Sequence, residues 1–213
     1  MMISDSIEGI RWWQQAQPTP EELYLSGGLL VEDWPHARQV VYLSAQLFEA
    51  TQVLHHMGDK EMRLLDRAAL LHNTGMMVET RRHHKHSFRL IKDTPLPDFS
   101  EKERYEIACI ARYHRRALPS QQHEEYAALG RSARKRVSVL ASLLRIADAL
   151  DYNHDRCVLA LNVDPTRCTD TTWTLLLNVR PLADIDIELE AAYEKADLFE
   201  KVFSRKLHLV VQK

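Results

Sequence analysis

Residues 137–151 read VSVLASLLRIADALD, and this stretch decides the fold. Its apolar residues recur at the spacing of one helix face, at positions Val137, Leu140, Ala141 and Leu144. Asp148 continues the same row, 4, 7, 8 and 11 residues further on, so it shares that face. A buried carboxylate is costly unless it is paired or bound to a metal. The stretch therefore predicts a core helix whose inward aspartate binds a metal or pairs with a cation such as Arg145.

Three of the 11 histidines occupy the same kind of position on other predicted helices. His36 precedes a row of apolar residues by 4, 7 and 11 positions, whereas His72 and His114 each follow such a row by 3, 4 and 7 positions. A single inward histidine is usually a core residue that hydrogen-bonds a carbonyl group. Three of them together with an aspartate indicate a shared focus, because imidazole and carboxylate ligands suit Mn, Fe, Co, Ni or Zn.

The first two thirds of the chain predict helices whose ends are marked by caps, prolines and glycines. Capping boxes begin at Thr19 and Ser100. The predicted helices cover approximately residues 20–26, 34–56, 59–75, 84–91, 101–116 and 132–152. The last third predicts strands over 157–163, 173–179 and 207–212, with one amphipathic acidic helix over 184–203. The expected fold is mostly α, with a helical domain over 1–155 and a small α+β extension over 156–213 packed on it.

Composition bounds the function. Of 213 residues, 45% are hydrophobic and 27% charged, which is typical of a folded soluble domain. The net charge of −2 and the pI near 6.6 exclude a generally basic nucleic-acid binder. Three cysteines without zinc spacing predict free thiols in a reducing cytoplasm. Residues 1–15 do not have the pattern of a signal peptide, and no apolar run has transmembrane length, so we expect a cytoplasmic protein without membrane contact.

Basic residues gather in the middle of the chain. Residues 81–92 hold five Lys or Arg and no acid, and further basic groups occur in 112–116 and 131–136. Such runs are usually solvated helix faces. The alternative is a groove for a phosphate-rich ligand, because guanidinium groups match phosphate oxygens.

These residues together resemble a known superfamily. In order along the chain, the segments are His36, LHNTG at 71–75, HHKHS at 83–87, ARYHRR at 111–116 and LLRIADALD at 143–151. The series resembles the HD-domain superfamily of metal-dependent phosphohydrolases, a helical bundle. It is most similar to the C-terminal HD module of the exopolyphosphatase/guanosine pentaphosphatase family, from about residue 30 to the C-terminus.

The resemblance implies roles for individual residues. Four of them are implied metal ligands, namely His36, His72, Asn73 and Asp148. Two are implied catalytic groups that hold a second metal or the phosphate, namely His86 and His114. Three are implied to bind further phosphates of the substrate, namely Lys85, Arg115 and Arg116. In this superfamily a metal activates water for attack on phosphorus.

Two departures from the family pattern limit what can be carried over. The name-giving motif has Asp where this chain has Asn73, and a neutral amide neither bridges two cations nor offsets their charge. We therefore expect one divalent transition metal (Mn, Fe, Ni or Zn) on His36, His72 and Asp148, or an empty site. The sequence also does not contain the actin-like phosphatase domains that carry catalysis in exopolyphosphatases.

Three functions follow as hypotheses. The first is a metal-dependent phosphohydrolase that acts on a nucleotide or a polyphosphate. The second is a catalytically inactive module that binds such a polyanion, alone or beside a separate phosphatase subunit. The third is a structural protein that forms a homodimer through the acidic helix 184–203, although that helix is expected to pack on the strands. Nucleic-acid binding is the weakest candidate, because the basic cluster at 131–136 is short.

Overall fold

The computed structural model describes residues 16–212. The helices are α1 (Pro20–Leu25), α2 (Trp34–Ala50), α3 (Gln52–His55), α4 (Asp59–Leu71), the 3-10 helix η2 (Thr74–Met77), α5 (His83–Asp93), α6 (Glu101–Arg112), α7 (Glu124–Ala127), α8 (Arg131–Ala149), α9 (Asp186–Lys195) and α10 (Asp197–Phe203). The strands are β1 (Val158–Val163), β2 (Thr172–Val179) and β3 (Lys206–Gln212). The predicted class, mostly α with a small α+β tail, is confirmed.

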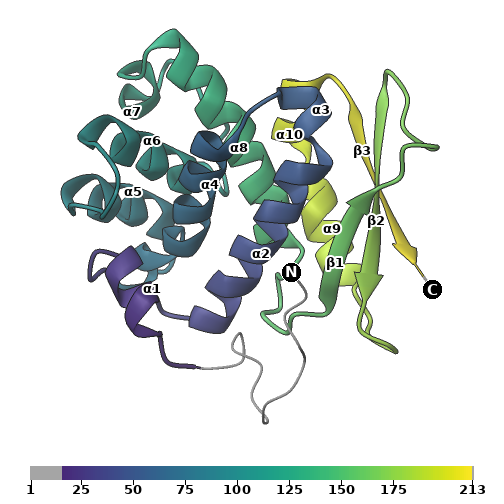
Figure 1. Ribbon diagram of the computed structural model, residues 1–213, viewed down its shortest axis with the longest axis horizontal. Helices are drawn as coiled ribbons and strands as arrows, with labels where there is room; N and C mark the ends of the chain where they lie inside the picture. Colours follow the sequence, from purple (N-terminus) through teal and green to yellow (C-terminus); the bar gives the residue numbers. More distant parts are fainter. Residues whose placement is uncertain (1–15, 213) are drawn as a thin grey trace.

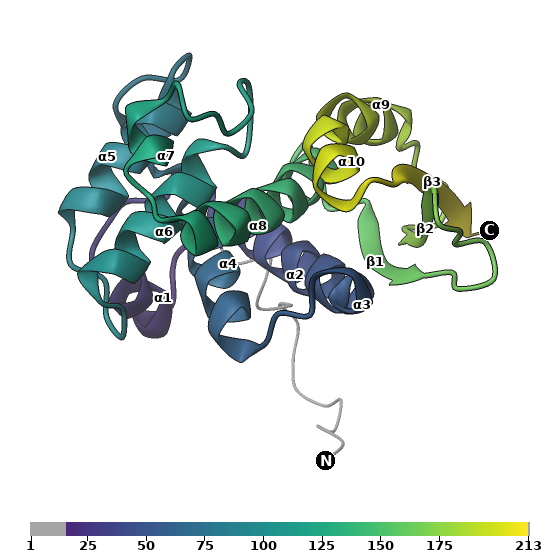
Figure 2. The same cartoon turned by 90° about the horizontal axis from the view of Figure 1, so that it is seen from above.

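Helix α8 runs through the middle of the molecule (Figures 1 and 2). Helices α4, α5, α6 and α7 lie on one side of it, and α9, α10 and the sheet lie on the other. The sheet order is β1-β2-β3, with β1 antiparallel and β3 parallel to β2. The helices α9 and α10 connect the two parallel strands; both contact α8, and α10 also contacts β3, while β1 contacts α2. This arrangement lets the tail reach the helical body directly.

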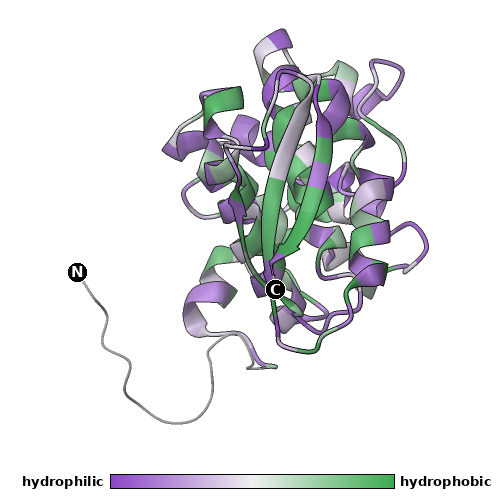
Figure 3. Ribbon diagram, turned by 90° about the vertical axis from the view of Figure 1, so that its right-hand side faces the viewer, coloured by the Kyte–Doolittle hydropathy of each residue, from purple (hydrophilic) through white to green (hydrophobic). Residues whose placement is uncertain are grey.

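One hydrophobic core joins the helical body and the tail. Its buried members include Leu43 of α2, Leu144 of α8 and Phe199 of α10. Polar contacts reinforce the junction, since Gln39 Nε2 of α2 donates to the Val158 carbonyl oxygen of β1 at 2.6 Å. Figure 3 views the molecule from the sheet side and shows largely hydrophobic strands. The three cysteines are free thiols, as the sequence predicts.

Both predicted capping boxes are present. Thr19 Oγ1 accepts the backbone N–H of Glu22, and Ser100 Oγ accepts that of Glu103. The predicted helix 34–56 is interrupted at Thr51, whose hydroxyl donates to the Leu47 carbonyl oxygen at 2.7 Å. Such back-bonding competes with the helix ladder, and it separates α2 from α3.

Three other predicted boundaries differ from the structure. The helix predicted to end at Gly75 ends at Leu71 and is followed by η2, and the helix predicted to end near Arg116 ends at Arg112. The single helix predicted over 184–203 is two helices, broken at Ala196. The residues on either side of this break both bind α8, as described below, and these contacts hold the break.

Within residues 16–212, no helix combines the length and the apolar character that a bilayer crossing requires. The expectation of no signal peptide rests on residues 1–15, which lie outside the described part of the chain.

Candidate metal centre

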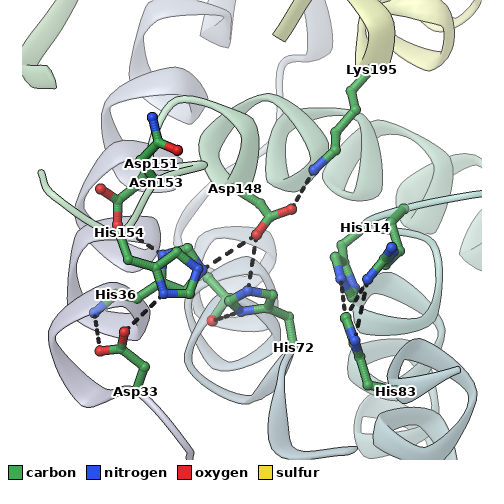
Figure 4. A network of polar contacts seen from close by, with 12 residues as sticks. Asp33, His36, His72, His83, His114, Asp148, Asp151, Asn153, His154 and Lys195 are labelled. Atoms are coloured by element: carbon green, nitrogen blue, oxygen red, sulfur yellow. Dashed lines mark hydrogen bonds and ion pairs between the residues drawn. The ribbon is translucent and has the colours of Figure 1, made fainter. Parts of the chain in front are cut away.

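Three side chains converge at the C-terminal end of α8. One ligand atom each from His36, His72 and Asp148 lies within 4.8 Å of the other two, as expected from the sequence (Figure 4). Asp148 Oδ1 is 3.4 Å from His36 Nε2 and 3.2 Å from His72 Nε2. Both imidazoles are buried, with 2% and 0% of the residue exposed. We call these three residues the ligand triad.

Acidic residues hold the backbone of His36 and both nitrogens of its ring. It lies in the first turn of α2, where Asp33 caps the helix by accepting the His36 backbone N–H at 3.0 Å. Its Nδ1 lies 2.8 Å from Asp151 Oδ2, one turn after Asp148 in the chain. The ring also stacks on His154, with 3.7 Å between ring centroids. Because a carboxylate accepts the proton of Nδ1, the neutral tautomer leaves a lone pair on Nε2.

His72 also has a proton on Nδ1, but here a backbone carbonyl oxygen accepts it rather than a carboxylate. It follows the last residue of α4, and its Nδ1 donates to the Ala69 carbonyl oxygen at 2.7 Å, which again leaves a lone pair on Nε2. The next turn is locked to α5, since Ser87 Oγ donates to the His72 carbonyl oxygen at 2.6 Å and accepts the Gly75 N–H at 2.9 Å. A Cβ on Gly75 would lie 2.2 Å from the His83 carbonyl oxygen, so the close approach requires glycine.

The ligand triad fits a transition metal. Within residues 16–212, His36 Nε2 and His72 Nε2 are both buried without a hydrogen-bond partner of good geometry, although a carboxylate oxygen lies nearby. Two imidazole Nε2 atoms converge on one carboxylate oxygen, so a cation is needed between them: a proton on His36 or a metal ion that takes its place. Two histidines and one carboxylate with their outer nitrogens already held are the ligands that such metals prefer.

The electrostatics also favour positive charge at this point. Burial lowers the pKa of His36, but Asp148 and Asp151 outweigh it and raise the pKa to about 9. Burial keeps the pKa of His72 below its ordinary value. Burial acts to raise the pKa of Asp148, but Lys195 and the two histidines hold it well below its ordinary value. Asp148 is therefore an anion at neutral pH.

The cation that pairs with Asp148 is Lys195, not Arg145. Lys195 Nζ of α9 lies 2.5 Å from Asp148 Oδ2, on the carboxylate oxygen that faces away from the histidines. Arg145 instead binds Asp197 Oδ1 at 2.9 Å and the carbonyl oxygens of Tyr113 and Arg116. The sequence alternative of an Asp148–Arg145 pair is wrong, because Arg145 connects α8 to α10 and to the turn after α6.

A pocket of about 230 Å³ opens beside the ligand triad. On the side away from His36 it is lined by His83, His114 and Arg115, which we call the cationic side. His83 Nε2 and His114 Nε2 are 3.1 Å apart (Figure 4), although each Nδ1 already donates to a backbone carbonyl oxygen. A hydrogen bond between the two Nε2 atoms therefore needs one additional proton. Burial lowers the pKa of His83 to about 4, so an anion must enter for the pair to hold that proton readily.

The structure brings some of the other predicted residues to this pocket and leaves others outside. Asn73 and Arg115 line it, and Asn73 Oδ1 is buried without a hydrogen-bond partner in the described residues. His86 does not line it; its Nε2 lies 3.3 Å from Glu79 Oε2 at the surface. Lys85 and Arg116 are exposed and do not line it either.

His83, which was not among the predicted site residues, lines the pocket, whereas the predicted His86 does not. The inward face of α5 carries His83 and Ser87, four residues apart, so His86 is turned toward the rim. That spacing is a signal that could have identified His83. Asp151 and His154 closely follow the predicted Asp148, whereas no local pattern marks Lys195 as part of the site.

The fold and the pocket define a helical protein with a buried ligand set of two histidines and one carboxylate. Residues 31–192 match the family described as "Ppx/GppA phosphatase, domain III", and this match covers well over half of the chain. The chain therefore belongs to the Ppx/GppA phosphatase family, and it corresponds there to domain III.

Similar curated proteins are named guanosine-5'-triphosphate,3'-diphosphate pyrophosphatase. The protein of Vibrio parahaemolyticus is 26% identical over 166 residues, which are 75% of this chain and 32% of that protein. The protein of Vibrio vulnificus is 27% identical over the same shares. The protein of Pseudoalteromonas translucida is 40% identical over 55 residues, 26% of this chain and 11% of that protein. The chain spans about a third or less of the length of these relatives.

Proposed function

We propose that this chain binds one divalent transition metal on His36, His72 and Asp148 and hydrolyses a phosphate ester or anhydride of a nucleotide or polyphosphate. The observation that carries the proposal is the convergence of two buried imidazole Nε2 atoms on one carboxylate oxygen, with one ligand atom of each residue within 4.8 Å of the others. When bound, such a metal supplies Lewis-acid chemistry at the phosphoryl group and lowers the pKa of water. The relatives' name, a pyrophosphatase of a guanosine nucleotide, supports the substrate class.

The cationic side of the pocket would bind the phosphoryl group. Arg115 offers a guanidinium group to its oxygens, and Lys195 Nζ adds a second positive charge at the pocket wall. A bound phosphate dianion favours the additional proton between His83 and His114. His114 is then the group that delivers a proton to the leaving oxygen.

Asn73 adds a weaker donor. Its carbonyl oxygen Oδ1 is buried at the pocket without a hydrogen-bond partner in residues 16–212, and an amide oxygen is a neutral ligand. Of the three carboxylates that line the pocket, Glu32, Asp33 and Asp148, only Asp148 groups with the two histidines among the described residues, and Lys195 binds its second oxygen. This charge balance favours one metal ion over two.

The test is elemental analysis of protein purified without chelator and then offered Mn, Fe, Ni and Zn, followed by a phosphatase assay with nucleotides and polyphosphate. We expect about one metal per chain, lost in Asp148→Ala together with activity. Asp170→Ala is the matched control, because the Asp170 side chain is fully exposed at the turn before β2. Wild-type protein that binds no metal after reloading would contradict the proposal.

A second candidate function is a module that binds the polyanion without hydrolysing it. Two observations favour it: Asn73 replaces the motif carboxylate, and the ammonium group of Lys195 already neutralises Asp148. Asn73→Asp separates the two functions. If the variant binds more metal and gains phosphodiesterase activity, the missing carboxylate limits the wild-type site. If the wild type is already active, the binding-only module is ruled out.

A further inference from the structure

One turn before Asp148, α8 carries a buried arginine, Arg145, which is 3% exposed. A guanidinium group stays charged in proteins, and burying it is costly unless its donors are matched. Arg145 donates four hydrogen bonds, three of them to backbone carbonyl oxygens. The positions of these acceptors indicate what the arginine does.

The Arg145 guanidinium group binds the C-terminal ends of two helices. Its Nη1 donates at 3.3 Å to the carbonyl oxygens of Tyr113, directly after α6, and of Arg116. Its Nε donates at 3.3 Å to the carbonyl oxygen of Lys195, the last residue of α9, and its Nη2 binds Asp197 Oδ1 at 2.9 Å. The last carbonyl groups of a helix lack partners within it and carry the negative end of its dipole. Arg145 supplies both donors and positive charge to these ends.

On the α6 side, the two acceptors enclose a turn that reaches the metal pocket. Tyr113 and Arg116 flank His114 and Arg115, which line the cationic side. The Arg116 backbone is left-handed, with a φ of 61°, a conformation that residues other than glycine rarely adopt. Because the turn is unfavourable by itself, the contacts from Arg145 hold it in place.

On the α9 side, Lys195 is held at two points by α8. Arg145 Nε binds its carbonyl oxygen, and Asp148 Oδ2 lies 2.5 Å from its Nζ. The chain turns away from α9 at the next residue, Ala196. Since the lysine side chain is long and flexible, its ammonium group stays on Asp148 only while the end of α9 is anchored.

We propose that Arg145 is a positioning residue that sets the places of Lys195 and Arg115 in the metal pocket. One planar guanidinium group bonds the backbone of both segments, so it fixes the end of α9 relative to the turn after α6. Lysine could not replace it, because an ammonium group lacks the planar fork of donors. This inference rests on the proposed function, since it concerns the pocket that would bind the metal and the phosphoryl group.

The first test is competitive chemical labelling of lysine amines in chelator-treated protein, followed by peptide mass spectrometry. Lys195 is ion-paired and its side chain is 19% exposed, so it should react slowly in the wild type. In Arg145→Gln we expect its labelling rate to rise about threefold or more relative to Lys201, an exposed lysine that serves as the internal reference. An unchanged ratio would overturn the proposal.

The second test is the affinity for Zn²⁺, measured by competition with a chromophoric chelator. If Arg145 holds Lys195 on Asp148, Arg145→Gln should raise the affinity about two- to fivefold, and this gain should not add to that of Lys195→Met. An arginine with a merely structural role predicts the opposite sign, because a loosened site binds metal less tightly. A lower affinity, or gains that add, would contradict the positioning role.

The effect on Arg115 is separated by using the Lys195→Met background. There, adding Arg145→Gln should still lower the affinity for inorganic phosphate about threefold in calorimetric titration of the Zn²⁺-loaded protein. The lysine is already absent, so the placement of Arg115 is what changes. Equal phosphate affinities would overturn the part of the proposal that concerns Arg115.

Arg67→Gln is the matched control for a lost buried arginine. Arg67 is 6% exposed and donates to the Leu25 carbonyl oxygen at 2.5 Å, and it does not line the pocket. We expect a comparable loss of stability without a change in the labelling ratio or the Zn²⁺ affinity. Equal changes in both variants would mean that lost stability alone explains the result.

Asp197→Asn keeps the proposal testable if Arg145→Gln does not fold. The Asp197 side chain is 47% exposed, and the change removes the charge that Arg145 Nη2 meets. We expect the same shifts in labelling and Zn²⁺ affinity, at about twofold, and none in Glu194→Gln, an exposed acid of α9. Wild-type protein that binds no metal would contradict the proposed function, and the labelling ratio would still decide the role of Arg145.

Discussion

The ligand triad and the cationic side face each other across a pocket of about 230 Å³, yet they are built for opposite charges. On the triad, Asp148 and Asp151 outweigh burial and raise the pKa of His36 to about 9. On the cationic side, burial and Arg115 lower the pKa of His83 to about 4. Both sides use imidazoles, so the residue type does not explain the difference. The neighbours do: carboxylates favour a cation at the triad, and a guanidinium group favours an anion opposite it.

The two sides also depend on different parts of the chain. The triad comes from α2, the end of α4 and α8, whereas the cationic side comes from α5 and the turn after α6. Gly75 and Ser87 hold these parts together. Lys195 of the tail reaches the triad from outside. Each of these connections can be broken separately.

The largest effect is expected from Gly75→Ala, which forces η2 and α5 apart. The added Cβ would lie 2.2 Å from the His83 carbonyl oxygen and 2.5 Å from the Ser87 nitrogen. Both are backbone atoms, so no side-chain rotation can relieve the clash. We expect the free energy of unfolding to fall by about 3 kcal/mol, measured by urea denaturation. Gly58→Ala is the control with open space around it, and it should cost about 1 kcal/mol or less. Equal losses would mean that the close approach is not needed.

Asp151→Asn tests whether the carboxylate beside His36 makes the ligand triad favour a cation. The change keeps the shape of the side chain but removes the charge that faces His36 Nδ1 at 2.8 Å. We expect metal affinity, measured by competition with a chromophoric chelator, to fall about 10- to 100-fold. In Asp33→Asn, which keeps the α2 cap because asparagine caps equally well, affinity should change about threefold at most. An unchanged affinity in Asp151→Asn would assign no role to this carboxylate.

Lys195→Met tests the contribution of the tail and should have a smaller effect. Removing the ammonium group beside Asp148 Oδ2 lowers the repulsion of a bound cation, so metal affinity should rise about fivefold. The affinity for inorganic phosphate should fall, because the pocket loses a positive charge. Lys201→Met, an exposed lysine of α10, is the control for the charge alone. A lower metal affinity in Lys195→Met would show that Lys195 chiefly orients the carboxylate.

The smallest effect is expected in the pH dependence of the free energy of unfolding below pH 6.5. The folded-state pKa values of His83 and His84 are both lowered to about 4, below the ordinary value of 6.5. The unfolded chain therefore binds more protons between these values, so the free energy of unfolding of metal-free protein should decrease as the pH falls from 6.5 toward 4. His84→Gln should show a shallower decrease in urea midpoints between pH 7 and 5. Identical slopes would contradict the lowered pKa of His84.

Local periodicity predicted the triad because each member continues an apolar helical row. Asp148 follows Leu140 and Leu144 at intervals of eight and four residues. Side chains at this spacing lie on the same face of a helix, so all three point toward the core. His114 was predicted inward and is 1% exposed, even though its helix ends at Arg112. Capping boxes likewise marked where helices begin, since a cap is a local interaction.

Local periodicity could not decide which of several neighbouring polar residues on one helix enters the pocket. Four residues of the HHKHS stretch are histidine or serine on one short helix, and the rotation of α5 decided that His83, not His86, enters the pocket. That rotation depends on how α5 packs against η2 and α6. The break of the tail helix at Ala196 depends in the same way on contacts with α8.

The sequence by itself determined the class of fold and that His36, His72, His114 and Asp148 are directed toward the interior, because hydrophobic periodicity and caps act within one segment. The tertiary structure decided the partners: Lys195 for Asp148, Asp197 for Arg145, and His83 for His114. These pairs are separated by 31 to 52 positions along the chain. Which of many equally charged side chains meet at such separations depends on how whole helices pack, and packing is a property of the assembled core.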